Sequence, residues 1–446
     1  MLNGERGIGT IQGIFDMIFR LPQIVSAMVA VSLFGVVGLS TPLSSSSSAS
    51  DETLEAVALT DRQIRLFEAQ AAKDPTAVVP SNRLARLYIQ KARENGDASY
   101  FTRAEKLLTR SLGQHPDNVE ALGLQAWLSL FKHDFQGAAT WAEQARRKRP
   151  NESWNYGVLS DAYLEMGEYA KAATYAQKMV DLRPDQGSYS RAAHFRSLHG
   201  DSDGAIELWL MAIQAGTRTG EYTAWCKAEL GDEYFNQGKF QKAEEAYRGS
   251  LNSFPGYHRA QAGLAKVREA HRQWVEAASL YQKAIDVVPY PQYVSALGDI
   301  YREMGQTEEA SRQYQLVEHI ANLDRVNQVL FNRDLALFYA DHDRNPEEAL
   351  RLAQKELQVR RDIYTYDILA WVYYQNGRYA EAREAVTAAM KLGTKDARIY
   401  FHAGMIAHAL GNRKEAKAYL SQALSINPSF HPLYSKTAQE TLQQLR

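Results

Sequence analysis

Alanine and proline recur along this chain of 446 residues with a period of about 34 residues. Pro116, Pro150 and Pro184 are evenly spaced at this interval, and the same interval separates Pro255 from Pro289. Ten alanines keep nearly the same register: Ala104, Ala138, Ala172, Ala205, Ala243, Ala277, Ala310, Ala349, Ala382 and Ala416. A fixed period of this length indicates a stack of similar supersecondary units, each of which buries its apolar face against the next.

Each period contains the pattern of two amphipathic helices joined by a turn. In one unit, Leu159 and Tyr163 share a face of the first helix, and Gly167 follows where that helix should end. The second helix places Ala172 and Met179 on one face, at positions i and i+7. The recurrent proline then ends the unit, because proline cannot continue a helix. The repeating unit is therefore predicted to be helix, turn, helix.

The order of small residue, Tyr, Gly, Ala, aromatic, Ala and Pro at this period resembles the tetratricopeptide repeat. Residues 230–255 (LGDEYFNQGKFQKAEEAYRGSLNSFP) and 369–390 (LAWVYYQNGRYAEAREAVTAAM) carry the resemblance most clearly. It implies an all-α fold, a right-handed superhelical solenoid of about ten helix-turn-helix repeats over residues 78–430. Residues 61–77 are expected to form a leading helix. Residues 431–446 are expected to form a C-terminal capping helix, which a stack of repeats needs for solubility.

The N-terminal segment has a different composition from the repeats. Residues 21–43 are 23 uncharged and mostly apolar residues, enough to span a bilayer. One interpretation is an uncleaved membrane anchor within residues 1–43. A second is a cleaved secretory signal, with the small residues Ser48–Ser50 at the cut. A third is a buried helix of the fold. The long leader before the apolar run favours the anchor.

The flanking charges predict an orientation for this segment. Arg6 and Arg20 precede it, and neither Lys nor Arg occurs between residues 41 and 60. The positive-inside rule therefore leaves the N-terminus in the cytoplasm and the repeats outside. Residues 44–60, which include a run of serines, are predicted to be a flexible linker. The expected location is membrane-anchored or secreted, with the repeats extracytoplasmic in a bacterial envelope.

Motifs that would indicate catalysis are missing from the sequence. It has no HExxH, P-loop or CxxC pattern, and its only cysteine, Cys226, is interpreted as a packed thiol. Asp341–Asn345 begins like a calcium loop, but Pro346 stands where that loop needs Gly, so a helix start is predicted instead. Formal net charge is −1, which argues against a nucleic-acid partner. We therefore expect no enzyme, no metal or cofactor, and no small-molecule substrate.

The resemblance implies that the first helices line a concave groove for an extended peptide or a partner helix. Acidic residues at central groove positions would repel a partner's C-terminal carboxylate. Fifteen residues are predicted to form the partner-binding groove, because they fall on that face away from the core stripe: Trp127, Phe131, Trp154, Asp161, Trp225, Asp232, Phe235, Lys266, Asp299, Arg302, Tyr364, Trp371, Tyr374, Arg398 and Phe401.

The predicted function is that of a non-enzymatic protein-interaction scaffold, exported or tethered to a membrane. One alternative is the substrate-recognition arm of an enzyme complex in glycan or cell-envelope biogenesis. Another is a receptor that faces the cytosol. A glycan-binding role through the groove aromatics is a further possibility, since exposed rings in a concave face indicate binding of some kind.

Overall fold

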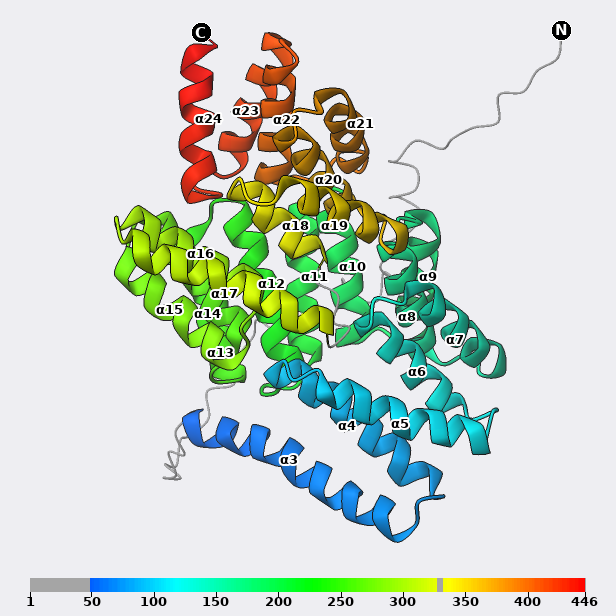
Figure 1. Ribbon diagram of the computed structural model, residues 1–446. Helices are drawn as coiled ribbons and strands as arrows, with labels where there is room; N and C mark the ends of the chain where they lie inside the picture. The colour runs from blue at the N-terminus through cyan, green and yellow to red at the C-terminus, as the bar shows by residue number, and fades with distance from the viewer. Residues whose placement is uncertain (1–48, 327–331, 446) are drawn as a thin grey trace, which may run out of the picture.

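The computed structural model describes residues 49–326 and 332–445. Over these residues every regular element is an α-helix, and ten successive helix pairs coil into a solenoid (Figure 1). The all-α solenoid of helix-turn-helix repeats that the sequence predicts is therefore confirmed.

A single helix, α3 (Ala49–Lys73), precedes the pairs, and α24 (Pro432–Gln444) follows them. The first helices of the pairs are α4 (Val78–Asn95), α6 (Val119–Phe131), α8 (Ser153–Glu165), α10 (Gln186–Leu198), α12 (Glu221–Asn236), α14 (His258–Ala270), α16 (Pro291–Glu303), α18 (Asn332–Asp341), α20 (Ile363–Gln375) and α22 (Ala397–Ala409). The second helices are α5 (Ser99–Gln114), α7 (Phe135–Lys148), α9 (Tyr169–Leu182), α11 (Ser202–Ala215), α13 (Phe240–Ser253), α15 (Trp274–Val287), α17 (Thr307–Val326), α19 (Pro346–Val359), α21 (Tyr379–Ala389) and α23 (Arg413–Ile426).

The N-terminal region differs from its prediction in one place. Helix α3 begins at Ala49, so residues 49–60 are helical where the sequence predicted a flexible linker. The predicted anchor or signal, residues 1–43, and the start of the linker lie outside the described residues. Among the residues that are described, none of the helices joins the length and the apolar character that crossing a bilayer requires.

Close packing inside the repeats explains the recurrent small residues. The Tyr247 ring is fully buried between two first helices. A methyl group added at Gly231 would lie 2.5 Å from this ring, and one added at Gly263 would lie 2.3 Å from it. Only glycine at both positions lets the ring enter, because a carbon atom at these distances would overlap it. Small residues in the first helices thus make room for the aromatic residue of the second helix.

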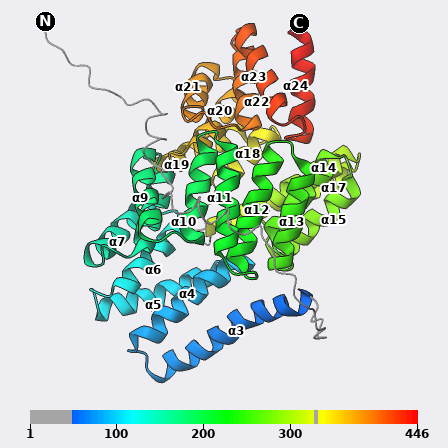
Figure 2. The same cartoon turned by 180° about the vertical axis from the view of Figure 1, so that it is seen from behind.

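The solenoid makes a full superhelical turn and then packs against itself. Helices α20 to α24, coloured from amber to red, lie over the green helices α10 to α12 (Figures 1 and 2). We call this contact the seam. At the seam, the short loops inside earlier helix pairs meet the junctions between later helix pairs. Four such contacts are Gly96 with Val288, Gly167 with Arg361, Gly200 with Gly393, and Gly238 with Asn427.

Hydrogen bonds cross the seam at a nearly constant offset along the chain. The Ile363 N–H donates to the Tyr169 hydroxyl over 2.9 Å, across 194 residues. The Thr394 hydroxyl donates to the Leu198 carbonyl, across 196 residues. The Asn427 amide donates to a buried main-chain carbonyl of the fifth pair over 2.8 Å, across 192 residues. The second superhelical turn is therefore held in register on the first.

A cluster of charged side chains lies at the middle of the seam. Arg360 Nε is 2.8 Å from a carboxylate oxygen of Glu165, and its NH1 is 3.3 Å from one of Glu356. Arg333 lies 3.0 Å from Asp362. In most solenoids each repeat contacts only its neighbours. Here the third helix pair also contacts the eighth and ninth, so the two superhelical turns stabilise each other.

Candidate binding cavity

A cavity of about 970 Å³ lies inside the first superhelical turn. One wall comes mainly from the first helices α4, α6, α8, α10, α12 and α14, with additional residues from the second helices α5 and α7. The other wall includes Val288, Tyr290, Ile320 and Arg360, which belong to later repeats and junctions. Pockets that hold ligands in proteins usually measure about 300–1,000 Å³. The cavity is therefore large enough for several residues of a partner chain.

Nine aromatic side chains are among the described residues that line the cavity: Phe101, Trp127, Phe131, Phe135, Phe195, Tyr222, Trp225, Tyr257 and Tyr290. Trp127 meets Phe131 edge-on, with ring centroids 5.5 Å apart. Trp225 stacks on Tyr222 at 5.4 Å. Rings held by neighbouring rings lose little further freedom when a ligand contacts them, and such residues often dominate binding energy.

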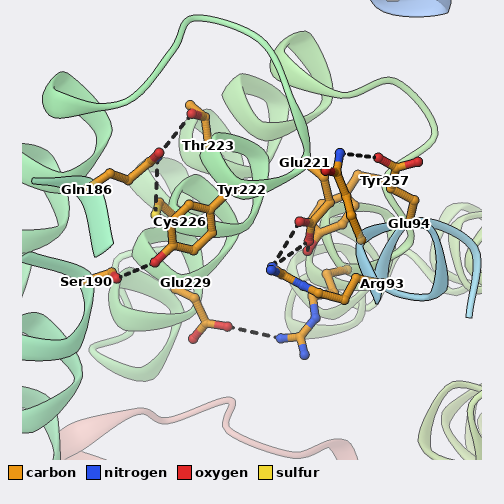
Figure 3. A network of polar contacts seen from close by, with 12 residues as sticks. Arg93, Glu94, Gln186, Ser190, Glu221, Tyr222, Thr223, Cys226, Glu229 and Tyr257 are labelled. Carbon is orange, nitrogen blue, oxygen red and sulfur yellow. Dashed lines mark hydrogen bonds and ion pairs between the residues drawn. The ribbon is translucent and has the colours of Figure 1, made fainter. Parts of the chain in front are cut away.

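A polar network closes one side of the cavity (Figure 3). Arg93, near the end of α4, reaches Glu221 at the start of α12, with its NH2 3.1 and 2.9 Å from the two carboxylate oxygens. The Tyr257 hydroxyl donates to the same carboxylate over 3.2 Å. The guanidinium also lies 5.6 Å from the centre of the Tyr222 ring. These contacts join the first helix pair to the fifth and sixth.

Cys226 belongs to the buried side of this network (Figure 3). Gln186 donates to the Thr223 hydroxyl over 3.0 Å and approaches the Cys226 sulfur at 3.7 Å. The Tyr222 and Ser190 hydroxyls are 2.9 Å apart. Burial raises the pKa of the Cys226 thiol to about 12. The thiol is therefore protonated at neutral pH and packs as a small apolar group, which is unsuited to nucleophilic attack.

One carboxyl group of the lining has an unusual pKa. Burial raises the pKa of Glu229 to about 7, although Arg259 lies 3.0 Å away and opposes the shift. Raised carboxyl pKa values occur both at catalytic sites and in buried ion pairs. Among the described lining residues, the hydrogen bonds join no histidine to a serine or to Cys226.

Four of the predicted groove residues line the cavity: Trp127, Phe131, Asp161 and Trp225. Trp154 lies directly behind them, edge-on against the Trp127 ring with centroids 5.2 Å apart. Tyr364 and Arg398 are partly exposed near the starts of α20 and α22, away from this cavity, and their role in binding remains a prediction.

Three predicted groove aromatics lie in the core instead, which corrects the prediction. Phe235, Trp371 and Phe401 are 7%, 3% and 1% exposed. Tyr434 of α24 stacks on Phe401 at 4.7 Å and meets Trp371 edge-on at 5.6 Å, and Tyr374 stacks on Trp371 at 4.7 Å. In the C-terminal repeats, aromatic side chains of successive first helices therefore pack together. A partner cannot reach the buried rings in this conformation.

The other predicted polar residues bind groups of the solenoid itself, within one repeat or between two adjacent ones. Asp232 accepts a hydrogen bond of 2.8 Å from the Tyr247 hydroxyl, and Lys266 lies 3.3 Å from it. Asp299 is 6% exposed and pairs with Arg302 at 3.1 Å. These carboxylates satisfy buried or bridging groups of the solenoid. None of the four side chains lines the cavity.

The sequence interpretation missed the arginines of the cavity. Arg191 pairs with Asp161 at 2.6 Å, and Arg259 pairs with Glu229 at 3.0 Å. Each arginine follows its acid by 30 residues, on the next first helix. Adjacent first helices lie side by side in a solenoid. An acidic residue followed by an arginine at a distance slightly shorter than one repeat therefore indicates an ion pair between two such helices, and this signal is present in the sequence.

We expect His258, a buried residue of the lining, to make the fold sensitive to acid. It is 2% exposed, and its Nδ1 lies 3.0 Å from the Tyr293 hydroxyl. Burial, with Arg259 nearby, lowers its pKa from 6.5 to about 3. As the pH falls, His258 therefore takes up a proton in the unfolded chain before it does so in the folded protein. The stability contributed by the neutral ring is full above pH 6.5 and is lost as the pH falls towards 3.

The measurement is urea unfolding of wild type and His258→Gln at pH 7.5 and pH 5. We compare the free energy of unfolding of the variant with that of wild type at each pH. Between pH 7.5 and pH 5 this difference should shift by about 2 kcal/mol in favour of the variant. His115 is exposed and provides the control, since His115→Gln should leave the pH dependence unchanged. Parallel pH profiles for wild type and His258→Gln would contradict the prediction.

The fold defines the class of this protein as an α-solenoid of helix pairs. Family profiles of the tetratricopeptide repeat match residues 89–153, 229–293, 155–186, 397–430 and 365–386. The chain is a tetratricopeptide repeat protein, as the repeat pattern in its sequence indicated. Proteins of this fold serve in general as scaffolds for protein partners.

Relatives and solved structures resemble parts or most of the chain. The human protein O-mannosyl-transferase TMTC1 is 26% identical over 226 residues, which is 48% of this chain and 24% of the relative. The chain thus spans about a quarter of that relative's length. The human IFIT1 dimer with PPP-AAAA has a TM-score of 0.46 at 13% identity, covering 82% of this chain and 94% of the other. Yeast Tom70 has a TM-score of 0.39 at 11% identity, covering 88% and 96%.

Proposed function

We propose that this protein is a non-enzymatic scaffold that holds a segment of a partner protein in the cavity. The observation that carries the proposal is the partly open cavity of about 970 Å³ inside the first superhelical turn, lined by rings from several first helices. A large concave site with aromatic walls is the usual form of a binding site, and aromatic anchors usually supply most of its affinity.

We further propose that the scaffold is exported or tethered to a membrane, with the repeats outside the cytoplasm. The uncharged run at residues 21–43 and the arginines before it support this location. Tagging the C-terminus of the full chain, followed by cell fractionation and protease treatment of intact cells, tests it. If the repeats resist the protease in intact cells, as cytosolic proteins do, the proposed orientation is wrong.

A second candidate function is the recognition arm of a glycosyl-transferring complex. The match to a human relative whose name is protein O-mannosyl-transferase favours it. In this case the scaffold would bring an acceptor protein to an enzyme, so a cavity-bound protein is expected here too. The two candidates differ in what accompanies the chain, because only the second predicts that a glycosyltransferase co-purifies with it. Turnover of a substrate by the purified chain alone would contradict both.

Photo-cross-linking in cells of the source organism tests the cavity directly. We expect a benzoylphenylalanine in place of Phe131, which lines the cavity, to form discrete adducts with partner proteins. The control places the same group at Val275, which is 67% exposed on α15 and lies outside the cavity. Adducts from Phe131 alone support the proposal. The absence of adducts, or the same adducts from both positions, would contradict it.

A further inference from the structure

The charged side chains of the cavity lining form a closed set. Among its described residues, the lining has five cationic side chains, four arginines and one lysine, and five carboxylates. Every cation lies within ion-pair distance of one of these carboxylates: Arg93 with Glu221 (2.9 Å), Lys132 with Glu105 (2.6 Å), Arg191 with Asp161 (2.6 Å), Arg259 with Glu229 (3.0 Å) and Arg360 with Glu165 (2.8 Å). When Glu229 is ionised, above its pKa of about 7, the wall is therefore neutral overall and its charges are compensated.

Most of these pairs are shielded from solvent. The exposed fraction of the side chain is 21% for Arg93 and 5% for Glu221, and 14% for Arg191 and 34% for Asp161. The Arg191 pair is bidentate, with Nε and NH2 at 2.9 and 2.6 Å from the two oxygens of Asp161. A ligand charge could enter such a pair only by displacing one member, which leaves the other charge uncompensated in a partly buried site.

We propose that the cavity selects an uncharged, aromatic or aliphatic segment of its partner. The inference rests on the proposed function, since it concerns the chemistry of the same bound segment. Rings such as Trp127, Phe131 and Trp225 supply apolar contact. The neutral wall gives neither an acidic nor a basic segment an electrostatic gain that would offset the loss of its hydration. The closed set of ion pairs therefore acts as a filter against charge.

The same geometry predicts how the selectivity can be reversed. Asp161→Asn keeps the shape of the side chain but frees the Arg191 guanidinium, which still donates to the Gly187 carbonyl over 3.0 Å and so stays in the wall. The cavity should then prefer segments with an acidic residue. Arg191→Met leaves the Asp161 carboxylate unpaired, and this cavity should prefer segments with a basic residue.

The experiment pans a displayed library of short random-sequence peptides against the full chain, purified in detergent. Wild type is expected to enrich peptides of net charge near zero that carry aromatic or aliphatic residues. An acidic representative should bind Asp161→Asn about tenfold more tightly than wild type, the change that a single new ion pair produces in a shielded site. Arg191→Met should show the opposite preference. Circular dichroism and thermal unfolding confirm that each variant is folded.

A control breaks an ion pair elsewhere, in which two guanidinium nitrogens contact one carboxylate oxygen. Arg378 binds Glu381 at 2.9 and 2.7 Å on the exposed start of α21, outside the cavity. Glu381→Gln should therefore select the same peptides as wild type. Enrichment of charged peptides by wild type, or no change in preference in either cavity variant, would overturn this inference while leaving the scaffold proposal intact. Failure to enrich any peptide would overturn both.

Discussion

We expect replacement of Arg360 by methionine to lower the free energy of unfolding by about 3–5 kcal/mol, the usual effect of removing one partner from a buried ion pair. The Arg360 side chain is 9% exposed and serves two carboxylates, Glu165 of the third helix pair and Glu356, which is 1% exposed. Burial already raises the pKa of Glu165, and Arg360 opposes that shift. Without the guanidinium, both carboxylates remain in the seam without their ion-pair partner, and only the less direct charge of Arg333 still acts on them.

Urea unfolding followed by circular dichroism measures this effect, and Arg351 provides the control, on the helix α19 that ends just before Arg360. Arg351 likewise makes two contacts, both with Glu348 and both at 2.6 Å, but its side chain is 54% exposed. Exposed pairs contribute about 0–1 kcal/mol, so Arg351→Met should change the stability little. Equal effects of the two substitutions would show that the seam does not bury this charge in solution.

The helix pairs were predictable from the sequence because each depends on local periodicity. Gly167 and Ala172 recur in register with their counterparts in other units, so the turn and the second helix can be read from a single repeat. Asn345 and Pro346 likewise predicted the start of α19, which the structure has at Pro346. Such signals involve residues a few positions apart.

The seam was not predictable in this way. Tyr169 and Ile363 are hydrogen-bonded across 194 residues, and neither position differs in type from those expected in any repeat. Their meeting depends on the curvature of the whole solenoid, which accumulates from small rotations between neighbouring repeats. The cavity depends on the same curvature, because Arg360 and Tyr290 complete its wall from later parts of the chain. The repeating pattern of alanines and prolines contains no such information.

The candidate site was predictable only in the first superhelical turn. Trp127 and Trp225 were assigned to a concave face, and they do line the cavity. Trp371 and Phe401 were assigned by the same rule and are buried, because Tyr434 of α24 packs against both rings. The rule identifies positions on the first helices, and some of these positions line the cavity. It does not say whether other rings of the chain already fill that face.

Gly167 lies where the two superhelical turns approach each other closely, and we expect a substitution there to have a large effect on the free energy of unfolding. It lies at the turn of the third helix pair with φ +75°. A methyl group there would lie 2.3 Å from the main-chain carbonyl oxygen of Arg361, which belongs to the second superhelical turn. Backbone atoms cannot move aside as a flexible side chain does. Alanine at this position would therefore push the seam apart.

We expect Gly167→Ala to lower the free energy of unfolding by about 2–5 kcal/mol. About 1–2 kcal/mol comes from placing an L-residue in the left-handed region, and about 1–3 kcal/mol comes from the overlap. Gly377 separates these two effects, because its φ is +71° and a methyl group there would have no atom within 4 Å. Gly377→Ala should show only the smaller cost. If both substitutions cost the same in urea unfolding, the second superhelical turn does not rest on the first in solution, and the wall that Arg360 and Tyr290 add to the cavity is lost with it.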